Sequence, residues 1–410
     1  MRYPLLALTL LALAPSLPVH AEESELGRRT PSELRTLVDR VTGRPLTVLT
    51  SGPSNDQKNY QTHPQWAADG VHIIFRSPDR NPARTPQAYA VNEVTGAITQ
   101  LTSGPGNETG SLNVARLSNR LYYQRTGPDA RQQVVELELT PLLADSAAGT
   151  VKSASDYERV LATLPADFKG AGGFTLDADE RTAYFGVRLA DGPPREPGKP
   201  IPQVPGGIRA VDLTTGTCRT VIDTPWLMGH VQANPWVPGE ILYCNETGGD
   251  APQRMWLVQA DGSGNRPLFA EAPSDWVTHE VFVDRDTVLF NLMGHTPELR
   301  LRPTGIQSIH LRTNEVLPLG QTARGQGFWH CNATPDGRWA VGDNFDGEVF
   351  LINRHTGEIR LVSTGHVMKP DHTHPNFSPD GTRILVQSGM LSGGTSLDLM
   401  LIPVPETAAP

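Results

Sequence analysis

The sequence predicts an all-β protein, a seven-bladed β-propeller whose last blade is closed by an N-terminal strand. Three observations predict this fold. A unit made of a tight turn followed by an apolar run occurs seven times. Successive units begin roughly 45 to 60 residues apart, close to the period of a four-stranded propeller blade. A strand-like stretch that lacks a hairpin partner stands at each end of the repeats.

The composition is typical of a globular chain that is rich in turns. Of the 410 residues, 38% are hydrophobic and 19% are charged, and there are 39 glycines and 36 prolines. The formal net charge of -9 argues against a nucleic-acid partner held through its phosphates. It leaves room for an acidic ligand at a locally positive site. The three cysteines allow at most one disulfide, and we expect them to be small core residues.

The first 21 residues are typical of a secretory signal peptide. Arg2 supplies the positive charge, Leu5 to Leu13 the apolar core, and Val19 to Ala21 a cleavage site of small residues. The apolar run is too short to span a bilayer, and no later segment qualifies. We therefore expect a signal peptide at 1-21, a single propeller domain at 22-410, and a periplasmic or secreted protein without a membrane span.

The remaining elements can be predicted in chain order. Leucine and valine spacing predicts a short helix within Glu22 to Val41. Leu46 to Thr50 resembles the closing strand of a hairpin, and Leu397 to Pro405 lacks its partner, so we expect these stretches to pair and close the ring. Between them, each repeated unit predicts an antiparallel hairpin. The units are Gln65 to Arg76, Val114 to Arg125, Phe174 to Gly186, Asn234 to Cys244, Val281 to Asn291, Asn332 to Gly342 and Asn376 to Gln387.

Two stretches interrupt the repeats. Ala144 to Val160 is expected to hold a short helix or a loop. The proline-rich stretch Asp191 to Pro205 is expected to be an insertion on the rim of the ring.

Half of the twelve histidines precede the repeated turns at matching distances. Side chains two residues apart on an extended chain point to the same side, and the chain enters each propeller blade by its innermost strand. We therefore expect these side chains to converge at one end of the central channel. Counted from the turn residue, His63, His279, His330 and His374 stand six residues before it, as does Gln232 in its own unit, while His230 and His372 stand eight before it.

A cluster of neutral imidazoles suits a divalent transition metal such as Mn, Fe, Ni or Zn. Histidine also titrates near neutral pH and can transfer protons. A proton-transfer or sugar-binding cluster without a metal is therefore the alternative. The sequence has no glycine-rich phosphate loop, no Gly-x-Ser-x-Gly elbow, and no pair of acids with a glycosidase spacing.

The motifs around these histidines resemble those of the oligogalacturonate lyase family, seven-bladed propellers that cleave short pectin fragments. The resemblance extends from about Leu46 to Pro403, and the His-x-His motif is its most specific part. The spacing between the Arg-Met-Trp and Thr-His-Glu motifs, 279 minus 254 or 25 residues, is also similar. The matching motifs are Asn59-Tyr60, Trp226-Leu227-x-Gly-His230, Leu242-Tyr-Cys-Asn-Glu246, Arg254-Met-Trp256, Thr278-His279-Glu280, His330 before Gly342-Asp343, and His372-Thr-His374-Pro-x-Phe377.

The resemblance implies a polysaccharide lyase for acidic oligosaccharides, with His279 as the catalytic base and Arg254 at the substrate carboxylate. It further implies Mn²⁺ held by three histidines and a glutamine. The histidines carry over to His330, His372 and His374, but Lys369 stands at the place of the glutamine, and a protonated lysine cannot bind a metal. Asn245 likewise stands where the family tends to have histidine. Lys369 thus becomes a candidate substrate-binding residue, together with His230, His63, Gln232 and Tyr60.

Two other functions remain open from the sequence. One is a non-catalytic periplasmic propeller that binds a protein or a glycan. The other is a metal-dependent propeller hydrolase. The aligned histidines favour an enzyme, because a scaffold has no need of them.

Overall fold

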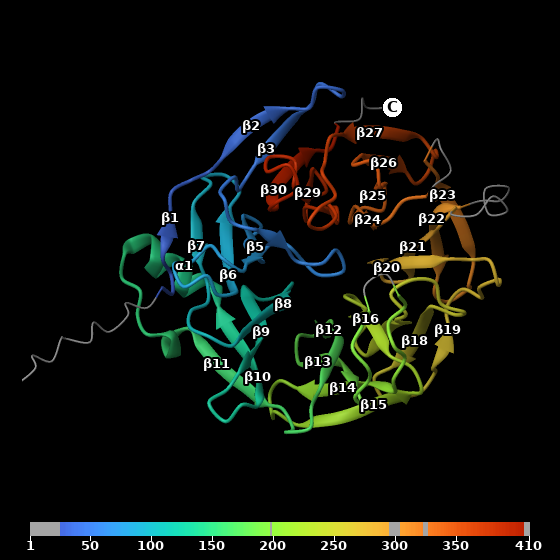
Figure 1. The fold of residues 1–410 in the computed structure, drawn as a ribbon, viewed down its shortest axis with the longest axis horizontal. Helices are drawn as coiled ribbons and strands as arrows, with labels where there is room; N and C mark the ends of the chain where they lie inside the picture. Colours follow the sequence, from blue (N-terminus) through green and yellow to red (C-terminus); the bar gives the residue numbers. More distant parts are fainter. Residues whose placement is uncertain (1–24, 197–198, 295–303, 323–326, 406–410) are drawn as a thin grey trace, which may run out of the picture.

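The computed structural model describes residues 25–196, 199–294, 304–322 and 327–405. It shows seven antiparallel sheets arranged in a ring, which follow one another around the axis in chain order (Figure 1). The predicted seven-bladed propeller is therefore confirmed. The predicted signal peptide lies outside the described residues.

The first four blades are built from β1 to β19. In sheet order, the first blade is β1 (Arg29–Thr30), β7 (Ile98–Gln100), β6 (Gln87–Asn92), β5 (His72–Ser77) and β4 (Gln57–Lys58), and the second is β11 (Glu158–Thr163), β10 (Gln132–Glu138), β9 (Arg120–Thr126) and β8 (Asn107–Val114). The third blade is β12 (Gly170–Leu176), β13 (Thr182–Arg188), β14 (Gly206–Asp212) and β15 (Cys218–Thr224). The fourth blade is β16 (Met228–Ala233), β17 (Glu240–Asn245), β18 (Met255–Gln259) and β19 (Arg266–Pro267).

The last three blades complete the ring. The fifth blade is β20 (Val277–Asp284), β21 (Thr287–Leu292), β22 (Gly305–His310) and β23 (Val316–Gly320). The sixth blade is β24 (Cys331–Ala333), β25 (Trp339–Asp343), β26 (Val349–Asn353) and β27 (Ile359–Ser363). The seventh blade is β2 (Arg35–Val38), β3 (Pro45–Val48), β30 (Asp398–Pro403), β29 (Arg383–Ser388) and β28 (Asn376–Phe377). The first strand of each repeat lies nearest the axis, so neighbouring blades meet there through strands such as β8, β12 and β16 (Figure 1).

The last blade joins the two ends of the chain. β3 pairs antiparallel with β30, with Thr47 opposite Leu401 and Val48 opposite Met400. The predicted ring closure is therefore confirmed, and the blue and red strands lie side by side in Figure 1. β2 extends the same sheet, and β1 pairs with the outer edge of the first blade.

The predicted helix within Glu22 to Val41 is wrong for the described part of that stretch. Residues 29–30 and 35–38 form β1 and β2 instead, because open sheet edges of two blades offer backbone hydrogen bonds there. The helix or loop predicted at Ala144 to Val160 is confirmed by α1 (Leu139–Ala148) and the short 3₁₀ turn at Ala154–Asp156.

Apolar side chains pack between adjacent blades. One buried cluster joins Val341 and Leu351 of the sixth blade to Ile384 and Ile402 of the seventh and to Leu46 of β3. Successive residues of strands such as β5 and β6 are buried, and since their side chains point to opposite faces, both faces of the sheet are packed against a neighbour. Among the described residues, no helix is long and apolar enough to cross a membrane.

The proline-rich insertion predicted on the rim packs against the fourth blade. The Ile201 amide donates to the Thr247 carbonyl at 2.7 Å, and the Gln203 side chain donates to the Glu246 carbonyl at 2.8 Å. This fixes the described part of the insertion beside the loop that carries Glu246.

Candidate active site in the central channel

The innermost strands are irregular where the predicted histidines stand. In β16 the pairing shifts between Gly229 and Gln232, and in β20 it shifts between Thr278 and Val281. Each shift adds one residue to the inner strand, as in a β-bulge, and bulges redirect side chains next to active sites. His230 and His279 lie inside these two bulges.

Three of these histidines have a left-handed backbone. The φ angles are 48° at His230, 54° at His279 and 47° at His374. A residue with a side chain pays on the order of 1 kcal/mol or more for this conformation, and such strain is concentrated at functional sites. The same strain at one position in three blades marks that position as the functional one.

The structure corrects the sequence alignment of the fourth repeat. One position of the innermost strand can be matched between blades by its pairing with the second strand. In the fourth, fifth and seventh blades these pairs are Gln232 with Leu242, Val281 with Leu289, and Asn376 with Leu385. Two residues earlier in each blade stands a histidine: His230, His279 and His374 respectively. The prediction that Gln232 takes the shared place was therefore wrong. The turn of this blade is longer, since Asn234 bonds across it to Glu240, whereas Ser378 bonds to Arg383.

Histidines from neighbouring blades lie against one another. The ring centroid of His330 is 4.3 Å from that of His279 and 4.0 Å from that of His374. His372 lies 5.5 Å from His330 and 6.3 Å from His374. Tyr60 reaches the same group from the first blade, 5.1 Å from His374 and 5.3 Å from His230. The predicted convergence is therefore confirmed for five of the six histidines, His63 being the exception.

A buried ion pair lies beside this cluster. Arg254 donates through Nε to Glu280 at 2.9 Å, and the two side chains are 4% and 0% exposed. The second oxygen of Glu280 lies 3.1 Å from Nδ1 of His230. Burial alone would raise the pKa of Glu280, but Arg254 and His230 lower that pKa well below its usual range. Glu280 is therefore a carboxylate that orients both neighbours.

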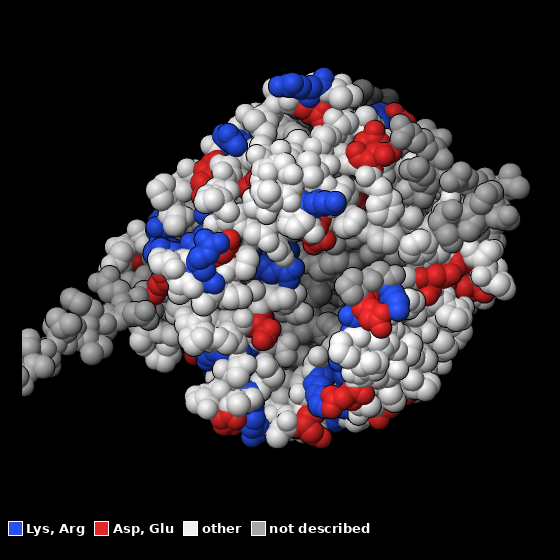
Figure 2. Space-filling model, in the orientation of Figure 1, with Lys and Arg blue, Asp and Glu red and all other residues white. Residues whose placement is uncertain are grey.

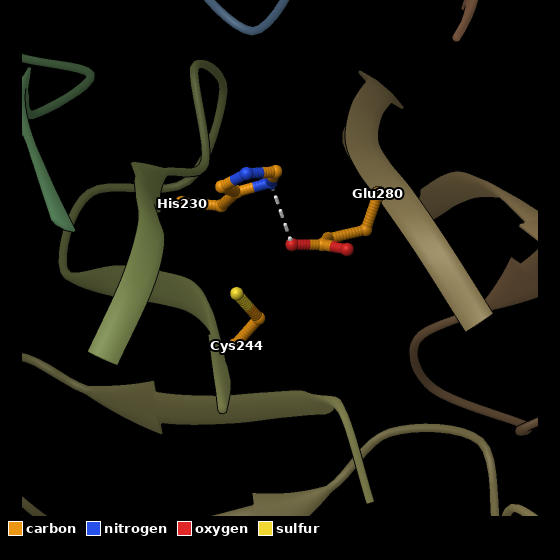
Figure 3. A group of neighbouring side chains, drawn as sticks. All are labelled: His230, Cys244 and Glu280. Atoms are coloured by element: carbon orange, nitrogen blue, oxygen red, sulfur yellow. Dashed lines mark ion pairs between the residues drawn. The ribbon is translucent and has the colours of Figure 1, made fainter. Parts of the chain in front are cut away.

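Figure 3 shows His230, Cys244 and Glu280 converging from three strands. The atoms of these three side chains that could bind a metal lie within 4.8 Å of one another. Among the described residues, no other set of three histidine, cysteine or acidic side chains lies so close together. The group does not suit a metal ion, because Arg254 already pairs with the same carboxylate. Burial also raises the pKa of the Cys244 thiol well above its usual range, so the thiolate is not available.

Burial keeps two of the central imidazoles, His279 and His374, neutral. Burial, followed by the neighbouring histidines, lowers the pKa of His279 well below its usual range. The same causes lower the pKa of His374 to about 3. The Thr278 hydroxyl lies 2.8 Å from Nδ1 of His279, so the other ring nitrogen remains available. A neutral imidazole of this kind can accept a proton or bind a metal.

The predicted metal ligands have a donor set that fits a divalent transition metal. Asp343 lies 3.1 Å from Nδ1 of His330, which leaves Nε2 as the ligand atom, a common arrangement behind metal-binding histidines. Nδ1 of His372 is buried without a hydrogen-bond partner. Asp371 adds a carboxylate, whose Oδ2 lies 3.2 Å from Nε2 of His374.

Lys369 stands apart from this cluster. It is exposed, and within the described residues no hydrogen bond or ion pair joins it to His330, His372 or His374. Asp371, two residues later, is the side chain that reaches the histidines. The structure therefore offers a carboxylate, and not the lysine, where the resemblance implies a glutamine.

Two other predicted substrate-binding residues already have protein partners. The His63 ring contacts the Thr62 hydroxyl at 2.9 Å and the Phe174 carbonyl at 2.8 Å. The Gln232 amide donates to the Glu280 carbonyl at 2.9 Å and thereby ties the fourth blade to the fifth. Both residues brace the channel wall in this arrangement.

Sequence reasoning did not single out Glu280, Asp343 and Asp371, although the first two stand inside quoted motifs. Another residue it missed is Lys58, which is 2% exposed and donates to Asn376 at 2.6 Å. The one available signal was a charged residue within or beside a strand that is otherwise apolar.

No family model matches the chain. An oligogalacturonate lyase from Dickeya dadantii is 24% identical, and the match covers 92% of this chain and 98% of the relative. An oligogalacturonide lyase from Pectobacterium atrosepticum is 22% identical with the same coverage. The solved structure of an oligogalacturonate lyase in complex with manganese superposes with a TM-score of 0.76 at 24% identity, and covers 93% of this chain and 98% of that one.

In sequence and in fold, this chain is similar to oligogalacturonate lyases along more than nine-tenths of its length, which confirms the resemblance indicated by its motifs.

Proposed function

We propose that this protein is a polysaccharide lyase that cleaves short uronic-acid oligosaccharides of the oligogalacturonate type by β-elimination. One observation carries the proposal: the neutral imidazole of His279 and the buried guanidinium of Arg254 lie on either side of the His230 ring and contact it. The named activity of the relatives, whose sequences match nearly the full chain, points to the same reaction class.

The chemistry of a uronate explains the need for both groups. The proton on C5 is weakly acidic because the adjacent carboxylate can accept only part of the developing charge. A cation on that carboxylate stabilises the enolate-like transition state. A neutral imidazole can take the proton near working pH. His279 is the proposed base in this scheme.

Arg254 is the proposed partner of the substrate carboxylate. Its Nε is committed to Glu280 at 2.9 Å, which fixes the plane of the guanidinium. Nη2 lies 3.4 Å from His230 and 3.9 Å from Glu246, so it faces the same space as the histidine rings. A planar guanidinium held in this way can bind a carboxylate with two parallel hydrogen bonds.

We further propose a divalent metal held by His330, His372 and His374 with Asp371, and we assign it as Mn²⁺ by analogy with the manganese complex of the similar lyase. When bound, such an ion polarises the substrate carboxylate. His330 is oriented for this purpose by Asp343, which is 0% exposed. The rest of the site binds and orients the sugar and holds the protons.

Export to the periplasm or the medium and a role in pectin degradation complete the proposal. The signal-like residues 1–21 support export. The proposed substrate is a short acidic oligosaccharide, in line with the named activity of the similar lyases. Figure 2 shows one face of the molecule, hollowed at the centre of the ring, with acidic and basic side chains scattered around it.

The test is a screen of purified protein against di-, tri- and tetragalacturonate, with and without added Mn²⁺. The expected result is a rise in ultraviolet absorbance from a 4,5-unsaturated uronate, in step with one new reducing end for each bond cleaved. A saturated product would favour the hydrolase alternative. Binding without any product would favour the non-catalytic propeller.

A further inference from the structure

β-Elimination moves two protons, and His279 accounts for only one of them. The C4–O4 bond breaks as the C4=C5 double bond forms, and the departing oxygen has to gain a proton. If the proposed lyase function holds, a side chain of this site has to give that proton.

His230 occupies the position in the fourth blade that His279 occupies in the fifth. Both stand inside a bulge of the innermost strand, both have a positive φ, and their ring centroids are 5.9 Å apart. The His230 side chain is 20% exposed, so it also reaches solvent from which it can regain a proton.

The two rings differ in what they face. His279 lies among His330, Trp329 and its Thr278 hydroxyl, which favour a neutral ring. His230 instead faces two carboxylates.

Around His230, Glu280 lies 3.1 Å from Nδ1 and Glu246 lies 3.8 Å from Nε2. Arg254 is the one cation among the described side chains placed against it, with Nη2 at 3.4 Å from Nδ1. Cys244 and Tyr60 add groups that are neutral at working pH. Two carboxylates and one guanidinium therefore surround the His230 ring.

Glu280 gives His230 a fixed orientation. Nδ1 of His230 lies 3.1 Å from Oε1 of Glu280 and 3.4 Å from Nη2 of Arg254, so the buried ion pair fixes this side of the ring. Nε2 has no hydrogen bond within the described part of the site, since Glu246 is 3.8 Å away. This is the arrangement in which a buried carboxylate holds one nitrogen and leaves the other for proton transfer.

We propose that His230, held by Glu280, is the general acid of the elimination and works opposite His279. His279 accepts the C5 proton, the C–H electrons form the C4=C5 bond, and the C4–O4 bond breaks. Nε2–H of His230 protonates the departing O4. Afterwards the proton on His279 is lost to solvent and His230 regains one, so no other reactant is needed.

The experiment compares two leaving groups. One substrate is digalacturonate, whose departing oxygen is a poor leaving group. The other is a galacturonate that carries a 4-O-(4-nitrophenyl) group, whose phenolate leaves without protonation. His230→Gln is expected to lower kcat on digalacturonate by about 10² to 10⁴-fold, the usual contribution of a positioned acid. On the nitrophenyl ether the same variant should lose less than about tenfold.

Three comparisons complete the design. His279→Gln should lose activity on both substrates, because C5 deprotonation is common to them. Tyr60→Phe should keep the wild-type ratio between the two substrates. His355→Gln, on an exposed turn of the sixth blade, is the unchanged control.

Glu280→Gln tests the positioning role separately. It should lower digalacturonate turnover more than nitrophenyl ether turnover, because only the first substrate needs a proton on its departing oxygen. Equal losses on both substrates in His230→Gln would overturn the inference, as would a selective loss in Tyr60→Phe. Wild-type protein that is inactive on both substrates would overturn the proposed function itself.

Discussion

At the scale of single residues, His279 and His230 show that surroundings decide what an imidazole can do. Both come from the same position of a repeated blade. Burial and neighbouring imidazoles lower the pKa of His279, whereas His230 is set between carboxylates. A repeated fold can thus place one residue type several times and give each copy a different environment.

Replacement of the proposed base gives the first prediction. His279→Ala should lower kcat on trigalacturonate by about 10² to 10⁴-fold, because proton abstraction loses its base. Substrate binding should remain, since Arg254 is untouched. Steady-state kinetics together with calorimetric titration of the substrate would check both parts. Full activity in this variant would contradict the assignment.

Arg254 is best probed with a substitution that keeps its charge. Alanine would leave the buried Glu280 carboxylate without its guanidinium partner, at a cost of about 3 to 5 kcal/mol in folding free energy. Arg254→Lys avoids most of that cost but loses the planar fork. We expect it to raise KM and lower kcat together, because the carboxylate contact exists in ground and transition states. An unchanged KM would show that the guanidinium does not touch the substrate.

Metal binding is predicted to depend on His372. Wild-type protein treated with chelator should gain thermal stability when Mn²⁺ is added, since a ligand that binds only the folded state stabilises it. His372→Ala should lose this gain, whereas His355→Ala, on an exposed turn, should keep it. Scanning calorimetry measures the effect without any assay of activity. An equal Mn²⁺ shift in His372→Ala would place the ion elsewhere.

At the scale of elements, the closing strand β3 is expected to hold the ring together. Leu46 is 1% exposed and packs with Ile402 and Leu351. Leu46→Ala should therefore lower the free energy of unfolding by about 2 to 5 kcal/mol. Val38 of β2 is 64% exposed, so Val38→Ala is the matched control and should change little. Urea titrations would compare them, and similar midpoints would contradict a structural role for β3.

The same blade carries a pH-dependent residue. Asp398 of β30 is 1% exposed, and its Oδ1 has no hydrogen-bond partner among the described residues. Burial, with Asp56 and Glu33 nearby, raises its pKa to about 7, against the opposing effect of Arg35 and Arg80. The folded state therefore binds a proton more tightly than the unfolded chain.

Stability should consequently fall as the pH rises from about 4 to about 7, by about 4 kcal/mol at most for this one group. Above that range both states are ionised and the contribution becomes flat. Asp398→Asn should remove the slope and be more stable than wild type at pH 8. Unfolding measured in urea between pH 5 and pH 8 would show this, and parallel curves for the two proteins would rule it out.

At the scale of the whole molecule, repetition made the fold predictable. The seven turn units and the two unpaired end strands determine the number of blades and the closure, and both are visible in the sequence. The N-terminal helix was mispredicted because Leu34, Leu37 and Val41 have helical spacing, whereas sheet edges far along the chain decide the structure there. Local pattern cannot reveal an edge that comes from another blade.

The candidate site was predictable only in part, for a related reason. His279, His330 and His374 share one position of the repeat, so their convergence follows from periodicity. Glu280, Asp343 and Asp371 act by contacts that depend on bulges and on the packing between blades. The longer turn of the fourth repeat also hid the true place of His230.

The shared histidine position has a consequence for how a long substrate would lie. Five consecutive blades, from the fourth around to the first, place a histidine there. The second and third blades have Ser111 and Gly173 instead, and these two line a groove of about 400 Å³. The ring is therefore asymmetric, with histidine side chains at this position along five blades and the groove along the other two. A sugar chain whose reacting unit lies among the histidines has room to extend only over this groove, so the asymmetry of the ring would fix the direction in which the substrate binds.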